Sequence, residues 1–220
     1  MSYPTLRLHP RKEESVLRFH PWIFSGAIAS FSAPVEDGDL VSVVDSKGRP
    51  LGTGHFGGGS IAVRLLSFDA EEVIDRAFYK RRLEAALRLR LSCDLVRPFG
   101  SSDSPNTTYR LVHGEGDSLP GLIIDIYDRT AVVQAHSLGM HQARQTIAEV
   151  LWEVFAEAGD PVLSLEGIYY KSETTLPTRD MRELASDGFL IGHTEAAPIY
   201  ENGVRFTPDW LKGQKTGFFI

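Results

Sequence analysis

Two short segments of this 220-residue chain bring side chains with catalytic or binding chemistry close together. The first, His113 to Gly121, contains an imidazole and the carboxylates of Glu115 and Asp117, a set that could hold a metal ion or transfer protons. Its glycines suit tight turns with positive φ, and Asp117 can hydrogen-bond the turn in which it lies. We therefore expect a structural loop without a bound metal. A metal-dependent hydrolase is the alternative that metal analysis would decide.

The second segment, Arg18 to Gly26, combines a cation, an imidazole and three aromatic rings. Arginine and aromatic faces together can hold a phosphate and stack an unpaired base. The three rings, Phe19, Trp22 and Phe24, could instead alternate into a core, which still leaves the polar side chains outside. We predict RNA contacts in this segment from four residues: Arg18, His20, Trp22 and Ser25.

A glycine-rich tract, His55 to Gly59, resembles a phosphate-binding loop only in composition. Phosphate loops join a strand to the start of a helix, whereas residues 60–66 are β-branched and predict another strand. The expected structure is therefore a hairpin turn.

The composition is that of an ordinary globular protein, with 42% hydrophobic and 24% charged residues, enough for one large domain or two smaller ones. A net charge of -6 argues against a protein that coats nucleic acid nonspecifically. Basic side chains concentrate in the first twenty residues, however, which is compatible with a local basic patch. They are Arg7, Arg11, Lys12 and Arg18, with His9 and His20.

The chain has no apolar run approaching the roughly 18 residues of a membrane span, and its first residues lack the apolar stretch of a signal peptide. The single cysteine, Cys93, excludes an internal disulfide and fits a reducing compartment. We expect a cytoplasmic protein that does not contact a membrane. Cys93 is expected to be a small apolar filler at the end of a helix, not a nucleophile.

The first 70 residues contain short β-branched runs separated by turn residues. The clearest are residues 40–44 and 61–66, with residues 50–56 between them. Two further strands, at residues 4–8 and 22–27, would allow the segment to close into a small barrel, which removes exposed strand edges.

A helix is expected next, because Asp69 occupies an N-cap position with Glu72 three residues later. It should cover residues 73–92 and mark a domain boundary. Its basic residues, including Lys80 and Arg81, predict a solvated face first and RNA contacts second.

The second unit is predicted to contain three strands, a helix and a fourth strand. In order, these are residues 109–112, 122–127, 131–135, the helix 141–158, and residues 164–170. Gly159 and Pro161 supply a helix stop. The stretch past Lys171, to Asp187, is polar and predicts a long exposed connection.

Strand character returns at residues 189–194, 197–201 and 204–207, and Asn202-Gly203 is the pair that a tight primed hairpin turn prefers. The last residues, Phe218 to Ile220, are apolar, whereas chain ends are usually polar and frayed. We expect a partner to cover them, either a missing C-terminal domain or a second copy in a homodimer.

Three segments resemble successive signatures of one family. They are Phe19-His-Pro-Trp-Ile-Phe-Ser-Gly26, Tyr109-Arg-Leu-Val-His-Gly-Glu-Gly-Asp-Ser-Leu-Pro-Gly-Leu122 with Asp125, and Gly213-Gln-Lys-Thr-Gly-Phe-Phe219. The family is that of the S-adenosylmethionine-dependent ribosomal RNA cytosine-C5 methyltransferases that begin with a PUA domain. The match runs in order along essentially all 220 residues.

The resemblance implies an α+β fold in three parts. These are a small PUA-type RNA-binding β-barrel (1–70), an α+β linker domain with a mixed sheet and helices (71–186), and the opening β-hairpin of a truncated, Rossmann-like methyltransferase domain (187–220). It also implies ribosomal RNA as partner and S-adenosylmethionine as the cofactor of the complete enzyme. The rim of the methyl-donor site would be Lys215, Thr216, Gly217 and Phe218.

Members of this family are expected to attack cytosine C6 with a cysteine thiolate, a form of covalent catalysis. Cys93 does not match that nucleophile, so we expect no catalytic residue in this chain and no methylation of RNA by the chain alone. Its role would be RNA recognition and positioning. The alternative is a stand-alone PUA-type RNA-binding or adaptor protein that was never an enzyme.

Overall fold

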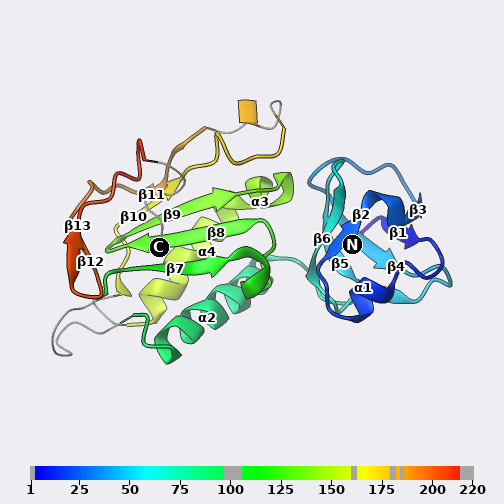
Figure 1. Ribbon diagram of the computed structural model, residues 1–220, viewed down its shortest axis with the longest axis horizontal. Helices are drawn as coiled ribbons and strands as arrows, with labels where there is room; N and C mark the ends of the chain where they lie inside the picture. Colours follow the sequence, from blue (N-terminus) through cyan, green and yellow to red (C-terminus); the bar gives the residue numbers. More distant parts are fainter. Residues whose placement is uncertain (1–2, 97–105, 160–162, 179–181, 184–185, 214–220) are drawn as a thin grey trace.

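The computed structural model describes residues 3–96, 106–159, 163–178, 182–183 and 186–213. They form two units joined by the segment after residue 67, with the N-terminal unit at the right of Figure 1 and the C-terminal unit at the left. No helix in these ranges combines the length and hydrophobicity needed to cross a bilayer.

The N-terminal unit is a six-stranded sheet, here called the N-terminal sheet, with the order β2-β6-β5-β4-β1-β3. Its strands are β1 Thr5–Leu8, β2 Trp22–Phe24, β3 Ile28–Phe31, β4 Leu40–Val44, β5 Pro50–Phe56 and β6 Ile61–Ser67. The pairing of β1 with β4 is parallel and the other pairings are antiparallel. Within the described ranges no backbone pairing joins the edge strands β2 and β3, so closure into a complete barrel stays a prediction.

Four of these strands, β1, β4, β5 and β6, begin and end close to the predicted residues. In β1, β4 and β6 the apolar alternation is regular. Leu6 and Leu8 of β1, Val41 and Val43 of β4 and Val63 and Leu65 of β6 form one buried core. The predicted strand at residues 22–27 was too long. The strand ends at Phe24, and the chain continues as the 3₁₀ turn η1 (Ser25–Ala27). Two elements were not predicted from the sequence: β3, which follows η1, and the one-turn helix α1 (Glu14–Leu17), which precedes β2.

The C-terminal unit is a five-stranded sheet, the C-terminal sheet, with the order β11-β10-β9-β8-β7. Its strands are β7 Thr108–His113, β8 Leu122–Tyr127, β9 Thr130–Ala135, β10 Gly167–Tyr170 and β11 Gly188–Gly192. Only the β9–β10 pairing is parallel, as expected where a helix connects two strands. Because β11 pairs with β10 in the same sheet, the predicted boundary after residue 186 does not separate this strand from the linker unit.

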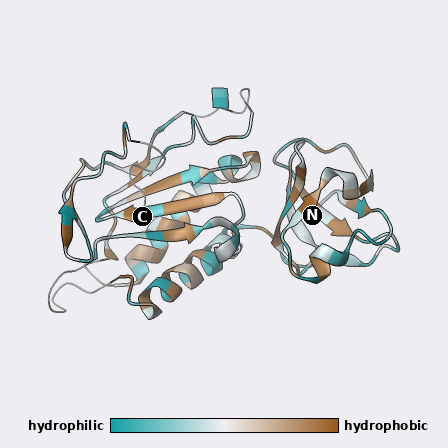
Figure 2. Ribbon diagram, in the orientation of Figure 1, coloured by the Kyte–Doolittle hydropathy of each residue, from teal (hydrophilic) through white to brown (hydrophobic). Residues whose placement is uncertain are grey.

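Helices cover one face of this sheet (Figure 1). They are α2 (Arg76–Ser92), α3 (Leu138–Gln142) and α4 (Arg144–Glu157). The apolar face of α2 and that of α4 pack with alternate residues of the central strands in one core, visible as brown ribbon in Figure 2. The predicted single helix at residues 141–158 is thus two helices, with Ser137 capping the first and a break at Ala143.

The opposite face of the sheet is covered as well. Tyr127, Val132 and Tyr169 pack there against Ile199 and Trp210, which follow the sheet in sequence. Strands buried on both faces explain why β8, β9 and β10 show apolar runs without clear alternation. The covering hairpin consists of β12 (Ile199–Glu201) and β13 (Val204–Phe206).

The predicted hairpin turn is confirmed, because Asn202 and Gly203 have φ of 48° and 83°. Gly159 also adopts a positive φ after α4. Most described residues of the predicted connection after Lys171 are exposed, as expected, but Ser172 and Leu176 are buried. The Lys171 ammonium donates to the carbonyls of Trp210 and Gly213, so this segment ties the later chain to the sheet.

The start of α2 corrects the sequence prediction. The N-cap is Asp75, whose Oδ1 accepts the Phe78 N–H at 2.9 Å, whereas Asp69 accepts the N–H of Glu71 in a preceding turn. An aspartate that closes a local turn competes with helix capping, so Asp69 resembles an N-cap in sequence without being one.

We predict that Asp75→Ala lowers the free energy of unfolding by about 1 kcal/mol, since it removes the N-cap of the longest helix. Asp69→Ala is the matched control and should lower the free energy of unfolding clearly less. Chemical denaturation measures both. Equal costs would show that α2 begins near residue 70 as the sequence suggested.

Candidate functional site

The turn between α1 and β2 presents an aromatic ring to solvent on an unusual backbone. Phe19 has φ of 61°, a left-handed conformation that is rare for a residue with a large side chain. Its ring is 74% exposed and meets the Phe68 ring edge-on at 5.3 Å between centroids. A strained residue that holds an exposed apolar ring indicates a functional position more than a structural one.

Backbone hydrogen bonds fix this turn. The N–H of Phe19 donates to Val16, and the N–H groups of Arg18 and His20 both donate to the carbonyl of Ser15. These bonds use carbonyls that the end of α1 would otherwise leave unpaired. His20 Nδ1 then accepts the N–H of Trp22 at 3.2 Å, which sets the direction of β2.

The alternative in which all three aromatic rings alternate into a core does not hold. Phe19 and Phe24 are exposed and Trp22 is half-buried, while Ile23 between them is buried in the core of the N-terminal sheet. The side chains of β2 do alternate between the two faces of the sheet, but Ile23 points into the core and its aromatic neighbours point away from it. The predicted contact residues Arg18, His20 and Ser25 are exposed, as the RNA interpretation needs.

Trp22 contacts the second unit. Its Nε1–H donates to Glu115 Oε1 at 2.7 Å, across a separation of 93 residues. Glu115 lies in η2 (Gly114–Asp117), the turn between β7 and β8. Trp22 therefore links the two units, and its indole N–H is already occupied.

Trp22 belongs to a row of side chains on the N-terminal sheet. It pairs in register with Arg64 on β6, and Arg64 pairs with His55 on β5. Each member meets the C-terminal unit: Trp22 at Glu115, Arg64 beside Gly121, and His55 against Gly139 of α3. The His55 ring lies where a Cβ at Gly139 would have to be, so only glycine permits this approach.

Burial makes His55 a neutral side chain. Desolvation, with a smaller contribution from the charge of Arg64, lowers the pKa of His55 to about 4. This role was not predicted from the sequence, since the tract containing His55 suggested only a turn. The turn itself is confirmed, because β5 ends at Phe56 and β6 begins at Ile61.

A groove of about 370 Å³ lies beside Phe19, where the two units meet. Phe19 and Phe68 form one wall, and Arg82 of α2 and Pro120 contribute to the other. The Arg82 guanidinium stacks 5.0 Å from the centre of the Phe78 ring and is 3.5 Å from a carboxylate oxygen of Glu72. The groove thus offers exposed aromatic surface on which a base could stack, whereas the charge of Arg82 is already paired with Glu72.

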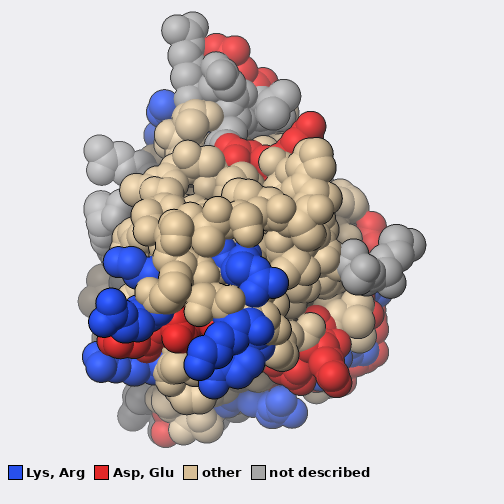
Figure 3. Space-filling view, turned by 90° about the vertical axis from the view of Figure 1, so that its right-hand side faces the viewer, with Lys and Arg blue, Asp and Glu red and all other residues tan. Residues whose placement is uncertain are grey.

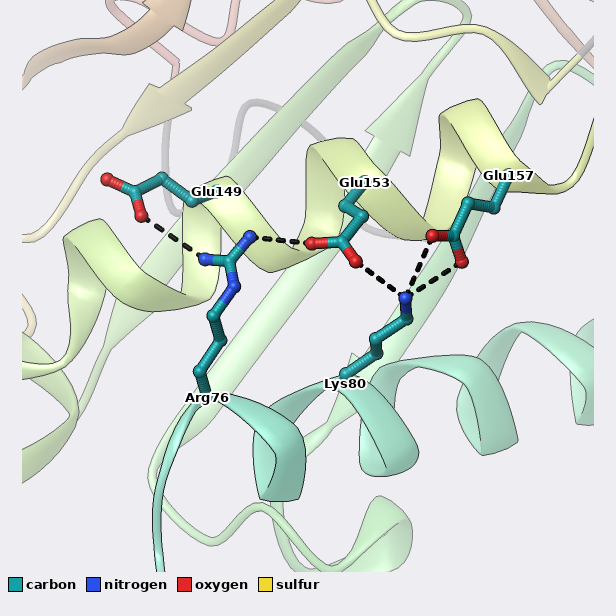
Figure 4. Close-up of polar contacts among 5 residues, drawn as sticks. All are labelled: Arg76, Lys80, Glu149, Glu153 and Glu157. Carbon is teal, nitrogen blue, oxygen red and sulfur yellow. Dashed lines mark hydrogen bonds and ion pairs between the residues drawn. The ribbon is translucent and has the colours of Figure 1, made fainter.

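Two other basic residues of α2, Arg76 and Lys80, do not line this groove. Lys80 donates to Glu153 at 2.6 Å and to Glu157 at 2.9 Å, and Arg76 bridges Glu149 and Glu153 beside it (Figure 4). The hydrogen bond from Lys80 to Glu153 is the main cause that raises the pKa of Lys80.

Arg81, the other predicted α2 contact, pairs with Glu72 at 2.9 Å. The interpretation of Lys80 and Arg81 as RNA contacts is therefore not favoured, because their charges already have partners within the fold.

Charge on the N-terminal unit is mixed. Residues 1–68 hold seven Lys and Arg against six Asp and Glu. Figure 3 views the outer end of this unit and shows blue basic side chains gathered in its lower half, with red acidic groups between them. Of the basic residues in this unit, Arg18 has no ion pair among the described residues, whereas Arg49 pairs with Asp45 at 2.5 Å.

The acidic side chains of the loop at residues 113–121 have partners within the fold. Asp117 forms an ion pair with the guanidinium of Arg90, both almost fully buried, and also accepts the N–H of His113 at 2.6 Å. Glu115 is engaged by Trp22. Nowhere in the described part of the chain do three His, Cys, Asp or Glu side chains gather as metal ligands would.

Two further predictions concern cysteine and cofactor. Cys93 follows α2 as expected, but it is exposed, so its interpretation as a buried filler is wrong. The residues assigned to the methyl-donor rim, Lys215, Thr216, Gly217 and Phe218, lie outside the described residues.

Two comparisons with known proteins concern the fold. Residues 6–68, nearly the whole N-terminal sheet, match the family described as a PUA-like domain. A putative SAM-dependent methyltransferase from Streptococcus mutans has the same fold over 94% of this chain and 48% of its own, with a TM-score of 0.71 at 18% identity. A putative methyltransferase solved in complex with SAH gives 0.72 with the same coverage and identity.

The sequence comparison is more specific. Over 98% of its length the chain is 38% identical to "Ribosomal RNA large subunit methyltransferase I" of Shewanella amazonensis. Over 99% it is 33% identical to the protein of the same name from Klebsiella pneumoniae subsp. pneumoniae. Each alignment covers 51% of the relative, so the chain spans about half the length of the curated relatives that it matches.

The neutral His55 predicts a pH dependence of stability. Its pKa is about 4 in the folded chain and near 6.5 when unfolded, so the unfolded chain binds the extra proton between these values. Stability should therefore be fully present above pH 6.5 and fall by about 2–3 kcal/mol as the pH drops to 4. Denaturant unfolding at several pH values measures this loss.

His55→Gln provides the control, because it removes the titrating group. Its stability should change less between pH 6.5 and 4 than that of the unmodified chain. An identical pH dependence in both proteins would contradict a buried neutral imidazole at this position.

Proposed function

We propose that this chain supplies RNA recognition and positioning for S-adenosylmethionine-dependent methylation of large-subunit ribosomal RNA. The support is similarity along nearly the whole chain to two relatives named as large-subunit ribosomal RNA methyltransferases, together with the PUA-like match of residues 6–68. In the finer form of the proposal the acceptor is C5 of a cytosine, the N-terminal sheet is the RNA-binding domain, and the C-terminal unit links it to the methyl-transfer site.

One structural observation carries the proposal. The turn at Arg18, Phe19 and His20 exposes an aromatic ring on a left-handed backbone, next to a guanidinium that has no ion-pair partner in the described ranges. A base can stack on the ring while the guanidinium contacts a phosphate. Binding energy collected here, away from the reacting base, would orient the RNA for chemistry elsewhere.

S-adenosylmethionine enters the proposal only through the relatives. When bound, it supplies the methyl group. The residues that we assign to its site, 215–218, lie outside the described part of the chain, so no step of methyl transfer is derived from this structure. Cytoplasmic location and a homodimer stay predictions.

RNA binding tests the turn directly. We predict that Arg18→Ala weakens binding of a ribosomal RNA fragment about tenfold and lowers the slope of log K against log salt by about 0.7–0.9, because one phosphate contact is lost. Phe19→Ala should cost about 1–3 kcal/mol of binding free energy through lost stacking and leave the salt slope unchanged. Filter binding over a salt series measures both.

Arg81→Ala is the matched control, since Arg81 is an exposed arginine already paired with Glu72. It should leave affinity within about twofold. If Arg81→Ala and Arg18→Ala weaken binding equally, the RNA lies along α2 and our surface is wrong. If the unmodified chain shows no salt-dependent binding, the proposed function fails.

Methyl transfer is tested separately. We expect no incorporation of a labelled methyl group from S-adenosylmethionine into ribosomal RNA by these 220 residues alone, although RNA binding is retained. Scintillation counting of precipitated RNA is the measurement. Incorporation above background would contradict the assignment of recognition without catalysis.

A further inference from the structure

A second cavity lies between the two units, away from Phe19. It measures about 290 Å³ and is bounded by the turn between β5 and β6 (Gly57 to Ser60), by Arg64, and by Ser137 and Thr178 of the C-terminal unit. The N–H of Ser25, one of the predicted RNA contacts, donates to the carbonyl of Ser60. The cavity therefore begins where the Arg18–Ser25 segment ends.

Arg64 brings an uncompensated positive charge to this cavity. It is half-buried, and within the described residues its guanidinium has neither a hydrogen bond nor an ion pair. Burial lowers the pKa of Arg64, and Glu115 opposes this only through longer-range attraction. Taking a guanidinium partly out of water without a partner is unfavourable, so the fold leaves Arg64 able to gain from an anion.

The neighbours of Arg64 provide no anion. His55, adjacent on β5, is buried and neutral, and its Nδ1 has no hydrogen-bond partner. Oε1 of Glu115 accepts the indole N–H of Trp22. A Cβ at Gly59 would meet no atom within 4 Å, so the glycine turn leaves room for a ligand to approach.

We propose that this cavity binds a phosphate group of the RNA backbone, with the Arg64 guanidinium as its main ligand. The proposal rests on the proposed function, because it adds a second contact to the same RNA. A guanidinium presents paired N–H donors that match two phosphate oxygens. With one contact at the Phe19 groove and one at Arg64, the RNA strand would lie along the junction of the two units.

One acidic residue opposes the phosphate. Asp37 lies at the edge of the cavity, and its Oδ1 accepts the N–H of Gly58 at 2.6 Å. The carboxylate thus shapes the glycine turn but repels an anion beside it. Asp37→Asn keeps an oxygen that can accept the Gly58 N–H and removes the charge, so it should strengthen phosphate binding.

The experiment has two arms on the full 220-residue chain. In the first, inorganic phosphate is titrated at constant ionic strength while the Arg64 Nε–Hε resonance is followed by NMR. In the second, binding of a ribosomal RNA fragment and of a five-nucleotide oligouridylate is measured over a salt series. The variants are Arg64→Gln, Arg64→Lys and Asp37→Asn, with thermal unfolding to confirm that each is folded.

We expect the Arg64 resonance to shift with phosphate, and to shift at lower phosphate concentration in Asp37→Asn. Arg64→Gln should weaken RNA binding about tenfold and reduce the salt slope by about 0.7, one phosphate on a single strand. Arg64→Lys should lose less RNA affinity than Arg64→Gln, because lysine keeps the positive charge although it lacks the paired N–H donors of a guanidinium. Asp37→Asn should bind RNA about two- to fivefold more tightly by relief of repulsion.

The outcomes separate the two proposals. Absence of RNA binding by the unmodified chain refutes the proposed function, and this inference with it. Normal RNA binding by Arg64→Gln and Asp37→Asn, with unchanged salt slopes, overturns only the Arg64 contact. A phosphate shift combined with unchanged RNA affinity also overturns it, since the anion site would then not serve RNA.

Discussion

The relation between the two units depends on how closely the His55 side of the N-terminal sheet approaches α3. The His55 ring occupies the space that a side chain at position 139 would need, so the glycine there sets the spacing. At that distance water is excluded from the imidazole, which stays neutral. The same approach brings Arg64 beside Gly121 and leaves it partly dehydrated without an acidic partner.

Other contacts along this junction orient the units without filling it. Trp22 donates to Glu115 near one end, and Gly38 lies against the side chain of Gln142 near His55. At this junction lie the groove lined by Phe19, Phe68 and Arg82 and the cavity lined by Arg64. The junction therefore combines rigid packing with open polar and apolar surface, the arrangement expected of a site that receives an extended ligand.

The sequence predicted the ends of β4, β5 and β8 as the structure has them. In β4 the apolar alternation is regular, whereas β5 is delimited by the turn residues on either side of it. Features that depend on tertiary contacts were misplaced. The start of α2 fell on Asp69 because two aspartates compete as caps, and β11 was assigned to another domain because pairing with β10 is not visible in sequence. Among the residues of the proposed RNA surface, Arg18 and His20 were predicted from residue type alone. Arg64 and His55 were missed, because their importance lies in which surface they face, and a cross-strand row leaves no local pattern.

The left-handed backbone of Phe19 places two requirements on one position. Glycine or asparagine would adopt φ near 60° with less strain, so the conformation of the turn favours residues without a large ring. The surface it presents to RNA in our proposal needs that ring. Changes at residue 19 that make the chain more stable would then be those that remove its binding face, so selection for stability and selection for binding act in opposite directions at this residue.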